Sequence, residues 1–372
     1  RVVPIIPDEA RTFGMDPLFK EVGIYSPLGQ RYTPVDAETL MPYREATDGQ
    51  VLEEGITEAG SMASFMAAGT SYATHAEPLV PFYIFYSMFG FQRTGDQMWA
   101  CADARARGFL LGATAGRTTL NGEGLQHEDG HSHILATVVP TIRAYDPAFP
   151  YETAVIVKDG LRRMLRAGED VYYYLTLYNE DLVMPPMPAG VEDGILRGMY
   201  LFKKGDGDGR RRVTLLGSGS IMSEVLRAQE LLRERGVTAD VWSVTSYQLL
   251  RNEALEAERW SRLHPEAGPR VPLVTQLLQG AGPVVAASAY LKLVPDQIAR
   301  WAPQPFLPLG TDGFGRSDTR ERLRSFFEVD AASIAVASLH ALALAERFAP
   351  AEVARAIGEL GVDPEAADPR TR

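Results

Sequence analysis

Cysteine is almost absent from the 372-residue chain, in which Cys101 is the only one. A single cysteine excludes a disulfide bond within the chain and predicts a reducing compartment, which we expect to be the cytoplasm. Basic residues are also in deficit, with 37 lysines and arginines against 48 carboxylates and a net charge of −11. An acidic surface repels phosphate groups and anionic lipids, so we expect neither nucleic acid nor a membrane as a partner.

Long apolar runs are lacking as well. The most apolar stretch, residues 79–91, is shorter than the roughly 20 residues that cross a bilayer. The first residue is Arg1 rather than Met, so we expect a processed or cut piece or one part of a longer protein. No charged leader with an apolar core follows it, so we expect no signal peptide. The composition, 45% hydrophobic and 23% charged, is typical of globular proteins, and the length suggests about two or three domains.

Apolar runs and turn residues predict two α/β domains in series. In the first half we expect strands at residues 1–6, 78–88, 109–113 and 171–177, and helices at residues 56–72 and 151–165. The Pro- and Gly-rich residues 184–190 mark a boundary, and residues 203–210 are expected to form a hairpin turn. In the second half we expect strands at residues 213–216, 239–244, 283–289 and 333–337, and helices at residues 222–235 and 319–326. A strand–helix–strand order predicts parallel sheets.

Histidines gather in one glycine-containing segment. His127, His131 and His133 lie between residues 121 and 133, together with Glu123, Glu128 and Asp129. Histidine and carboxylate side chains could bind zinc or iron. Neutral imidazoles in a loop could instead move protons and bind a polar substrate. Zinc sites in loops usually have two well-separated ligand pairs, so the spacing gives the metal interpretation less support.

Glu58 and an aromatic cluster are the other candidates. Glu58 lies about one turn inside a helix start that is otherwise small and apolar. Its carboxylate either complements the helix dipole or, held in apolar surroundings, has a raised pKa and shares a proton. The aromatic residues at positions 82–91 indicate core packing, although the last of them could lie at a strand end beside a pocket. The glycines at positions 205–207 and 216–220 predict tight turns rather than phosphate loops.

Four motifs resemble those of the homodimeric, bacterial-type pyruvate dehydrogenase decarboxylating component. They lie at residues 7–14, 83–93, 118–133 and 310–318, so that the resemblance covers essentially the whole chain. It implies a transketolase-like pyrimidine-binding domain at residues 1–190, a linker at residues 191–210 and a transketolase carboxyl-terminal domain at residues 211–372. Both domains would be α/β, each with a mostly parallel sheet flanked by helices.

The resemblance also implies a reaction. The family uses thiamine diphosphate and magnesium to decarboxylate pyruvate oxidatively, and passes the acetyl group to the lipoyl group of dihydrolipoyl acetyltransferase. Glu58 matches the glutamate that hydrogen-bonds the aminopyrimidine nitrogen, which makes the neighbouring amino group a base. Ile56 matches an apolar residue under the cofactor. Phe89 matches the aromatic residue that stacks on the aminopyrimidine, and Tyr86 lies on the same pocket wall.

Further site residues follow from the same resemblance. His127 matches an active-site histidine that donates a proton or contacts the lipoyl sulfur. Glu9, taken as catalytic, and Asp8, taken as cofactor-binding, match acidic positions beside the cofactor. His131 and His133 are implied to contact the substrate.

One departure concerns the diphosphate. In this fold class a Gly-Asp-Gly motif with a later asparagine holds magnesium and diphosphate, but here Gly-Asp-Gly occurs only at residues 205–207. The resemblance therefore implies that magnesium has no ligands in this chain, that an amino-terminal part holds the diphosphate, and that the chain alone is inactive. A homodimer is implied as well. The alternatives are another thiamine-dependent 2-keto acid dehydrogenase or transketolase-like enzyme, a non-catalytic dimerisation fragment, and a metallohydrolase built on the His127 loop.

Overall fold

The chain divides into two compact units, each assembled from segments that are separate in the sequence. The computed structural model describes residues 1–7, 10–15, 17–35, 37, 44–207 and 209–371. The first unit consists of Arg1–Ala113, Leu135–Arg143 and Gly160–Thr176, and the second of Thr114–Ile134, Ala144–Asp159 and Leu177–Arg372. The histidine-bearing loop at residues 121–133 therefore belongs to the second unit.

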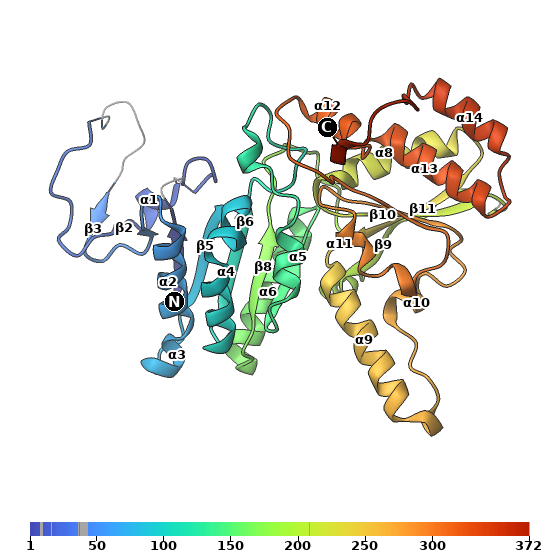
Figure 1. Ribbon diagram of the computed structural model, residues 1–372. Helices are drawn as coiled ribbons and strands as arrows, with labels where there is room; N and C mark the ends of the chain where they lie inside the picture. Colours follow the sequence, from blue (N-terminus) through green and yellow to red (C-terminus); the bar gives the residue numbers. More distant parts are fainter. Residues whose placement is uncertain (8–9, 16, 36, 38–43, 208, 372) are drawn as a thin grey trace. The chain divides into compact units, whose positions relative to one another are not determined.

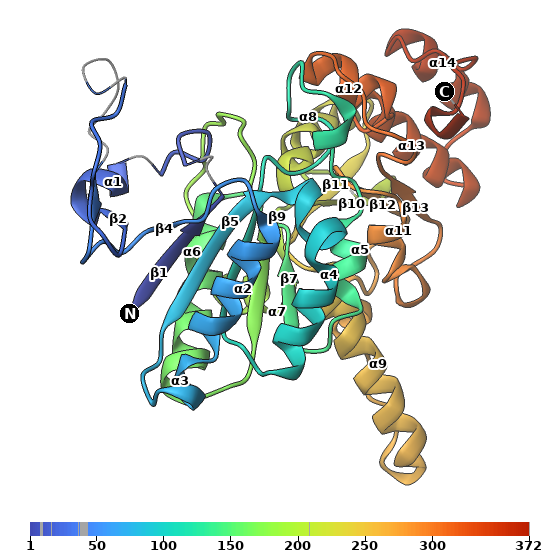
Figure 2. The ribbon, with the colours of Figure 1, turned by 60° about the vertical axis from the view of Figure 1, so that its left-hand side comes forward.

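A six-stranded sheet organises the first unit. Its strand order is β4 (Leu52–Glu53), β1 (Val2–Ile6), β5 (Val80–Tyr86), β6 (Gly108–Ala113), β8 (Tyr172–Thr176) and β7 (Ile142–Tyr145). The pairings from β4 through β1, β5 and β6 to β8 are all parallel. Helices α2 (Glu58–Gly69) and α4 (Ser87–Asp103) pack against each other and on the sheet (Figure 1, Figure 2). The carboxyl end of β5 leads directly into α4, which places the start of that helix at the carboxyl edge of the parallel strands.

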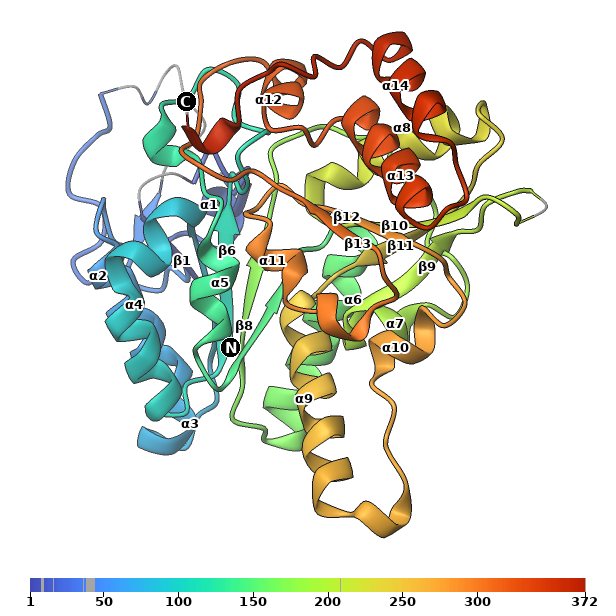
Figure 3. The same cartoon turned by 45° about the vertical axis from the view of Figure 1, so that its right-hand side comes forward.

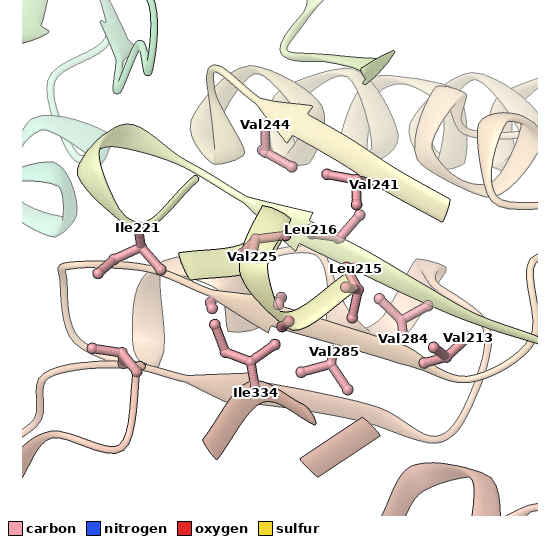
Figure 4. Packing of buried hydrophobic residues seen from close by; sticks show 14 of the residues in the cluster. Val213, Leu215, Leu216, Ile221, Val225, Val241, Val244, Val284, Val285 and Ile334 are labelled. Atoms are coloured by element: carbon pink, nitrogen blue, oxygen red, sulfur yellow. The ribbon is translucent and has the colours of Figure 1, made fainter. Parts of the chain in front are cut away.

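The second unit contains a five-stranded sheet. Its order is β13 (Phe306–Leu309), β12 (Val284–Ala287), β10 (Arg212–Gly217), β11 (Thr238–Val244) and β9 (Met199–Lys203). All pairings are parallel except that of β9 with β11. Helices α8 (Met222–Arg233) and α13 (Ala331–Leu344) pack together against the sheet, as Figure 3 shows. Valine, leucine and isoleucine side chains from the central strands, α8 and α13 fill the space between them (Figure 4).

The remaining elements are short or lie outside the sheets. They are α1 (Pro17–Glu21), β2 (Ile24–Tyr25), β3 (Glu45–Ala46), α3 (Ser71–Thr74), η1 (Leu125–His127), α5 (Ser132–Thr137), α6 (Pro150–Arg162), η2 (Arg163–Ala167), α7 (Glu192–Arg197), η3 (Gly219–Ile221), α9 (Tyr247–Leu263), η4 (Pro265–Ala267), α10 (Leu273–Leu277), α11 (Leu293–Asp296), η5 (Ala299–Trp301), α12 (Arg320–Phe326), α14 (Pro350–Glu359) and η6 (Pro369–Thr371).

The predicted fold class is confirmed, and two local predictions are wrong. Residues 333–337 are not a strand but part of α13, where the Asp330 side chain caps the helix by accepting a hydrogen bond from the Ser333 N–H at 2.8 Å. Residues 203–210 are not a hairpin turn, because β9 pairs with β11 rather than with β10. The strand expected at residues 78–88 is β5, and Phe89 and Phe91 follow its end in α4.

One described stretch, Arg320–Leu344, has the length and apolar composition of a membrane span. It is divided between α12 and α13, with Glu328 in the left-handed region at a φ of 57° between them. The apolar residues of α13 belong to the buried core of the second unit, among them Ile334 and Leu339. Helix α13 is therefore a core helix, and its buried residues lie on one face at the spacing of an amphipathic helix.

Candidate functional site

Glu58 is the first residue of α2, and the local sequence fixes where that helix starts. Thr57 is the N-cap, and its hydroxyl oxygen accepts a hydrogen bond from the Gly60 N–H at 3.2 Å. A carboxylate in the first turn is stabilised by the helix dipole. The Glu58 side chain is only 13% exposed, so the carboxylate is held in a defined place at the start of the helix.

The partner of Glu58 is an arginine. Arg93, on α4, donates from Nη1 to Glu58 Oε1 at 2.7 Å. The same guanidinium lies over the Phe89 ring, with its central carbon 4.0 Å from the ring centroid. Phe89 in turn meets Tyr86 edge to face at 6.1 Å. The surroundings of Glu58 are therefore not purely apolar, as the sequence suggested, because a cation occupies one of its oxygens.

Other predicted residues of the first unit are placed less tightly. Ile56 is 76% exposed and takes no part in the core of its unit. Tyr83 was not predicted as a site residue, yet it is fully buried on β5. Its pKa is raised by burial first and by the charge of Glu58 second. Asp8 and Glu9 lie outside the described residues.

In the second unit, His127 has a carboxylate partner on its own loop. It ends the 3₁₀ turn Leu125–His127, and its Nδ1 lies 3.4 Å from Glu123 Oε2. A carboxylate at this nitrogen favours the tautomer that carries its proton on Nδ1, which makes Nε2 the basic nitrogen of the neutral ring. The spacing of four residues between Glu123 and His127 was the signal in the sequence that could have identified the pair.

Asp129 anchors the rest of the histidine loop. Its Oδ1 accepts hydrogen bonds from the N–H groups of His131 and Ser132, each at 3.0 Å, and its Oδ2 accepts from the Ser132 hydroxyl at 2.5 Å. His133 is buried and meets the Tyr290 ring edge to face at 4.8 Å. Burial lowers the pKa of His133, against the opposing charges of Asp146 and Asp129. His133 is therefore a neutral imidazole fixed within the second unit at neutral pH.

Glu128 and Asp129 are both completely buried, but only Asp129 has hydrogen-bond partners within the described part of the chain. Neither carboxylate oxygen of Glu128 has a hydrogen-bond partner among the described residues. Burial raises its pKa to about 8, while the charge of Arg117 lowers the pKa and that of Glu123 raises it further. A carboxyl group with this pKa is mostly protonated at neutral pH. The sequence placed Glu128 beside the histidines, but gave no signal that it would be buried.

The predicted residues thus form two groups, one in each unit. Glu58, Tyr86 and Phe89 share the first group, and His127, His131 and His133 share the second. In the first group the planar guanidinium of Arg93 lies over the Phe89 ring and donates a hydrogen bond to Glu58 at the same time. A flat heteroaromatic ring with a hydrogen-bonding nitrogen can make the same pair of contacts, so these residues fit an aminopyrimidine.

Metal ligands are not assembled in the described part of the chain. Residues 1–7, 10–15, 17–35, 37, 44–207 and 209–371 contain no group of three or more His, Cys, Asp or Glu side chains that could hold a metal ion. The histidine loop therefore offers no ligand set for the metallohydrolase alternative. The Gly205 to Gly207 turn follows β9 and leads towards β10.

Comparisons with known families and structures agree with this architecture. Residues 1–185 match the pyruvate dehydrogenase E1 component middle domain, and residues 198–330 match the transketolase-like TK C-terminal domain. The pyruvate dehydrogenase E1 component of Pseudomonas aeruginosa is 55% identical over 99% of this chain, which spans 42% of that relative's length.

Solved transketolases share the fold. The transketolase from Leishmania mexicana superposes with a TM-score of 0.68 at 15% identity, over 94% of this chain and 43% of that one. A split-gene transketolase, described as an inactive beta4 tetramer, superposes with a TM-score of 0.59 at 17% identity and covers 92% of both chains. Through its middle domain and its transketolase-like carboxyl-terminal domain, the chain belongs to the pyruvate dehydrogenase E1 family.

Proposed function

We propose that this chain supplies the aminopyrimidine-binding and acyl-transfer residues of a pyruvate dehydrogenase decarboxylating component. The reaction is the oxidative decarboxylation of pyruvate with thiamine diphosphate, followed by acetyl transfer to the lipoyl group of an acetyltransferase component. The observation that carries the proposal is the arrangement at the start of α2 and α4. There the planar guanidinium of Arg93 bridges the Glu58 carboxylate and the face of Phe89.

Thiamine diphosphate, when bound, would supply a nucleophilic carbon and accept the electron pair released by decarboxylation. Glu58 would hold a proton against the ring nitrogen of the aminopyrimidine. Phe89 would offer its face for stacking, with Tyr86 supporting it edge to face. Ile56 is exposed beside the start of α2 and is available to contact the cofactor.

His127 would move the proton that acetyl transfer requires. Because Glu123 faces Nδ1, the ring would accept and return a proton at Nε2. A reduced lipoyl sulfur or the oxygen of the acyl group is a suitable proton partner for this nitrogen. We place His131 and His133 on the substrate side, with buried His133 supporting the loop rather than exchanging protons with water.

The rest of the machinery is proposed to lie in a region that the longer relatives carry and these residues do not. That region would hold magnesium and the diphosphate, and the chain alone would turn over no pyruvate. The description of the split-gene transketolase, of matching extent, as inactive supports this view. We further propose a cytoplasmic homodimer that works with dihydrolipoyl acetyltransferase.

A chimeric enzyme tests the proposal. These 372 residues would replace the matching 42% of the Pseudomonas aeruginosa relative. Pyruvate-dependent reduction of an artificial electron acceptor and acetylation of a lipoyl domain would then be measured with thiamine diphosphate and magnesium. We expect activity in the chimera and none in the isolated chain. A folded chimera that uses a larger 2-keto acid but not pyruvate would favour the alternative dehydrogenase.

Glu58→Gln in the chimera tests the central residue. We expect a loss of at least about a hundredfold in both assays with little change in folding, because the glutamine cannot hold the proton. Glu77→Gln is the matched control, since Glu77 also faces an arginine, Arg1, at 3.8 Å but is exposed. Full activity of the Glu58→Gln chimera would refute the assignment.

A further inference from the structure

Residues 311–318 form a distinctive segment that the proposed function leaves without a task. Within the second unit this segment follows β13 and lies against the histidine loop. Gly315 approaches that loop so closely that a Cβ atom placed on it would lie 2.1 Å from Glu128 Cβ and 3.3 Å from the Leu125 carbonyl oxygen. Leu125 begins the 3₁₀ turn that ends at His127. Gly315 therefore covers the turn that carries the histidine.

Arg117 ties the same two segments together through their backbones. Its Nη1 donates a hydrogen bond to the Thr311 carbonyl oxygen, which is 194 residues away in the sequence, and its Nε donates to the Glu128 carbonyl oxygen at 3.3 Å. The guanidinium is buried. Gly130 leaves room for it, since a Cβ atom there would lie 2.5 Å from Arg117 Cζ.

The two ends of segment 311–318 are themselves held firmly. The Thr311 N–H donates to the Tyr290 carbonyl oxygen at 2.9 Å, and its hydroxyl donates to the Ala289 carbonyl oxygen at 2.8 Å. Two residues beyond the other end, the Arg320 N–H donates to Asn121 Oδ1 at 3.0 Å, which ties the chain to the first residue of the histidine loop. The segment is thus anchored in the core of the second unit at Thr311 and can serve as a support for the loop.

The side chain of Glu128 is enclosed by this arrangement. It is fully buried beneath Gly315, and its carboxyl oxygens have no hydrogen-bond partner in the part of the chain that the structure describes. Burial without a partner disfavours the charged form of a carboxyl group. Of the charged groups that act on it, Arg117 favours the charged form and Glu123 opposes it. The Arg117 cation is also balanced by the charges of Asp129 and Asp312.

We infer that Arg117 and Gly315 form a joint that fixes the position of His127, and are positioning residues for the proton transfer assigned to that histidine. The inference rests on the proposed function for its catalytic part, while the joint itself rests on geometry. Gly122, Gly124 and Gly130 make the histidine loop conformationally permissive. A proton donor displaced by about 1 Å can lose two orders of magnitude in rate, so such a loop needs an external support.

Hydrogen exchange in the chain tests the joint without any need for activity. In Gly315→Ala the new methyl group must push the 3₁₀ turn away, and we expect the amides of residues 124–131 to exchange at least about tenfold faster. The amides of the central strands β10 and β12 should stay unchanged. Gly358→Ala is the matched control, because Gly358 lies in α14 of the same unit with nothing within 4 Å of its Cβ position.

Activity in the chimera tests the positioning role. In Gly315→Ala and Arg117→Met we expect the kcat of acetyl transfer to fall at least about tenfold and its pH profile to shift. The KM for pyruvate and the binding of thiamine diphosphate should change little. Arg117→Lys should restore part of the rate, since it keeps the cation but loses the fork of donors.

Every outcome separates the two claims. Unchanged exchange at residues 124–131 in Gly315→Ala and Arg117→Met refutes the joint. Faster exchange with an undiminished acetyl-transfer rate in an active chimera refutes the positioning role. If the unmodified chimera is inactive, the proposed function fails, and the exchange measurement still decides whether the joint exists. If Gly315→Ala does not fold, Arg117→Met gives both readings.

Discussion

Glu128 makes the stability of the second unit depend on pH in a way that one substitution should abolish. Its carboxyl group is fully buried, without a hydrogen-bond partner among the residues that the structure describes, and its pKa is raised from 4.5 to about 8. Because the folded state holds a proton that the unfolded chain releases, stability must fall as the pH rises from about 4.5 to about 8, and level off above that. The rise in pKa, at about 1.4 kcal/mol for each pH unit, amounts to about 5 kcal/mol.

Glu128→Gln replaces the acid by a neutral group of the same shape. Below pH 4.5 both side chains are uncharged, so the free energies of unfolding should be similar. At pH 6 the variant should be about 2 kcal/mol more stable, and at pH 9 about 4 to 5 kcal/mol more stable. Urea unfolding at about pH 4, 6 and 9 measures these differences, and Glu77→Gln, on an exposed side chain, is the control that should follow the wild type.

The reasoning fails if the two profiles run parallel. An equal slope for the wild type and Glu128→Gln between pH 5 and pH 8 would mean that the carboxyl group is already charged in the folded state. A variant that is less stable than the wild type at every pH would mean that the carboxylate has a partner that the amide cannot replace. In either case the buried acid beneath Gly315 would not be the neutral group described above.

Two further predictions concern arginines. Replacing Arg93 by Gln removes the guanidinium from Glu58 and from the face of Phe89, and a half-exposed ion pair and a cation–π contact are each worth about 0.5 to 1 kcal/mol. Thiamine diphosphate should therefore bind the chimera up to about tenfold more tightly in a calorimetric titration, whereas weaker binding would make Arg93 part of the site. Replacing Arg324 by Met leaves the carboxylates of Glu180 and Glu224, each at most 10% exposed, without their shared cation. Urea unfolding at pH 7 should show that the free energy of unfolding falls by about 3 to 5 kcal/mol, and a fall below about 1 kcal/mol would show that water screens these charges.

Much of the fold could be predicted because it depends on neighbours in the sequence. The Thr57 cap, the run of apolar residues in β5 and the unit of β10, α8 and β11 are all local signals, and the expected elements appear there. The failures arose where local signals were ambiguous. Residues 333–337 are small or β-branched, as in a strand, but they lie in a helix whose partly exposed positions are also mostly apolar, so that the helical period is hard to recognise in the sequence.

The candidate site divides in the same way. The sequence by itself determined which side chains are candidates for the chemistry, because the motifs around Glu58 and His127 are continuous runs of residues. Only the tertiary structure decided what those side chains meet: Arg93 against Glu58 across two helices, and Arg117 against Thr311 across 194 positions. Burial and long-range contacts are properties of the folded chain and leave no periodic trace in the sequence. That is why Glu128, one of three carboxylates in a polar loop, could be recognised as a buried acid only after folding had covered it with Gly315.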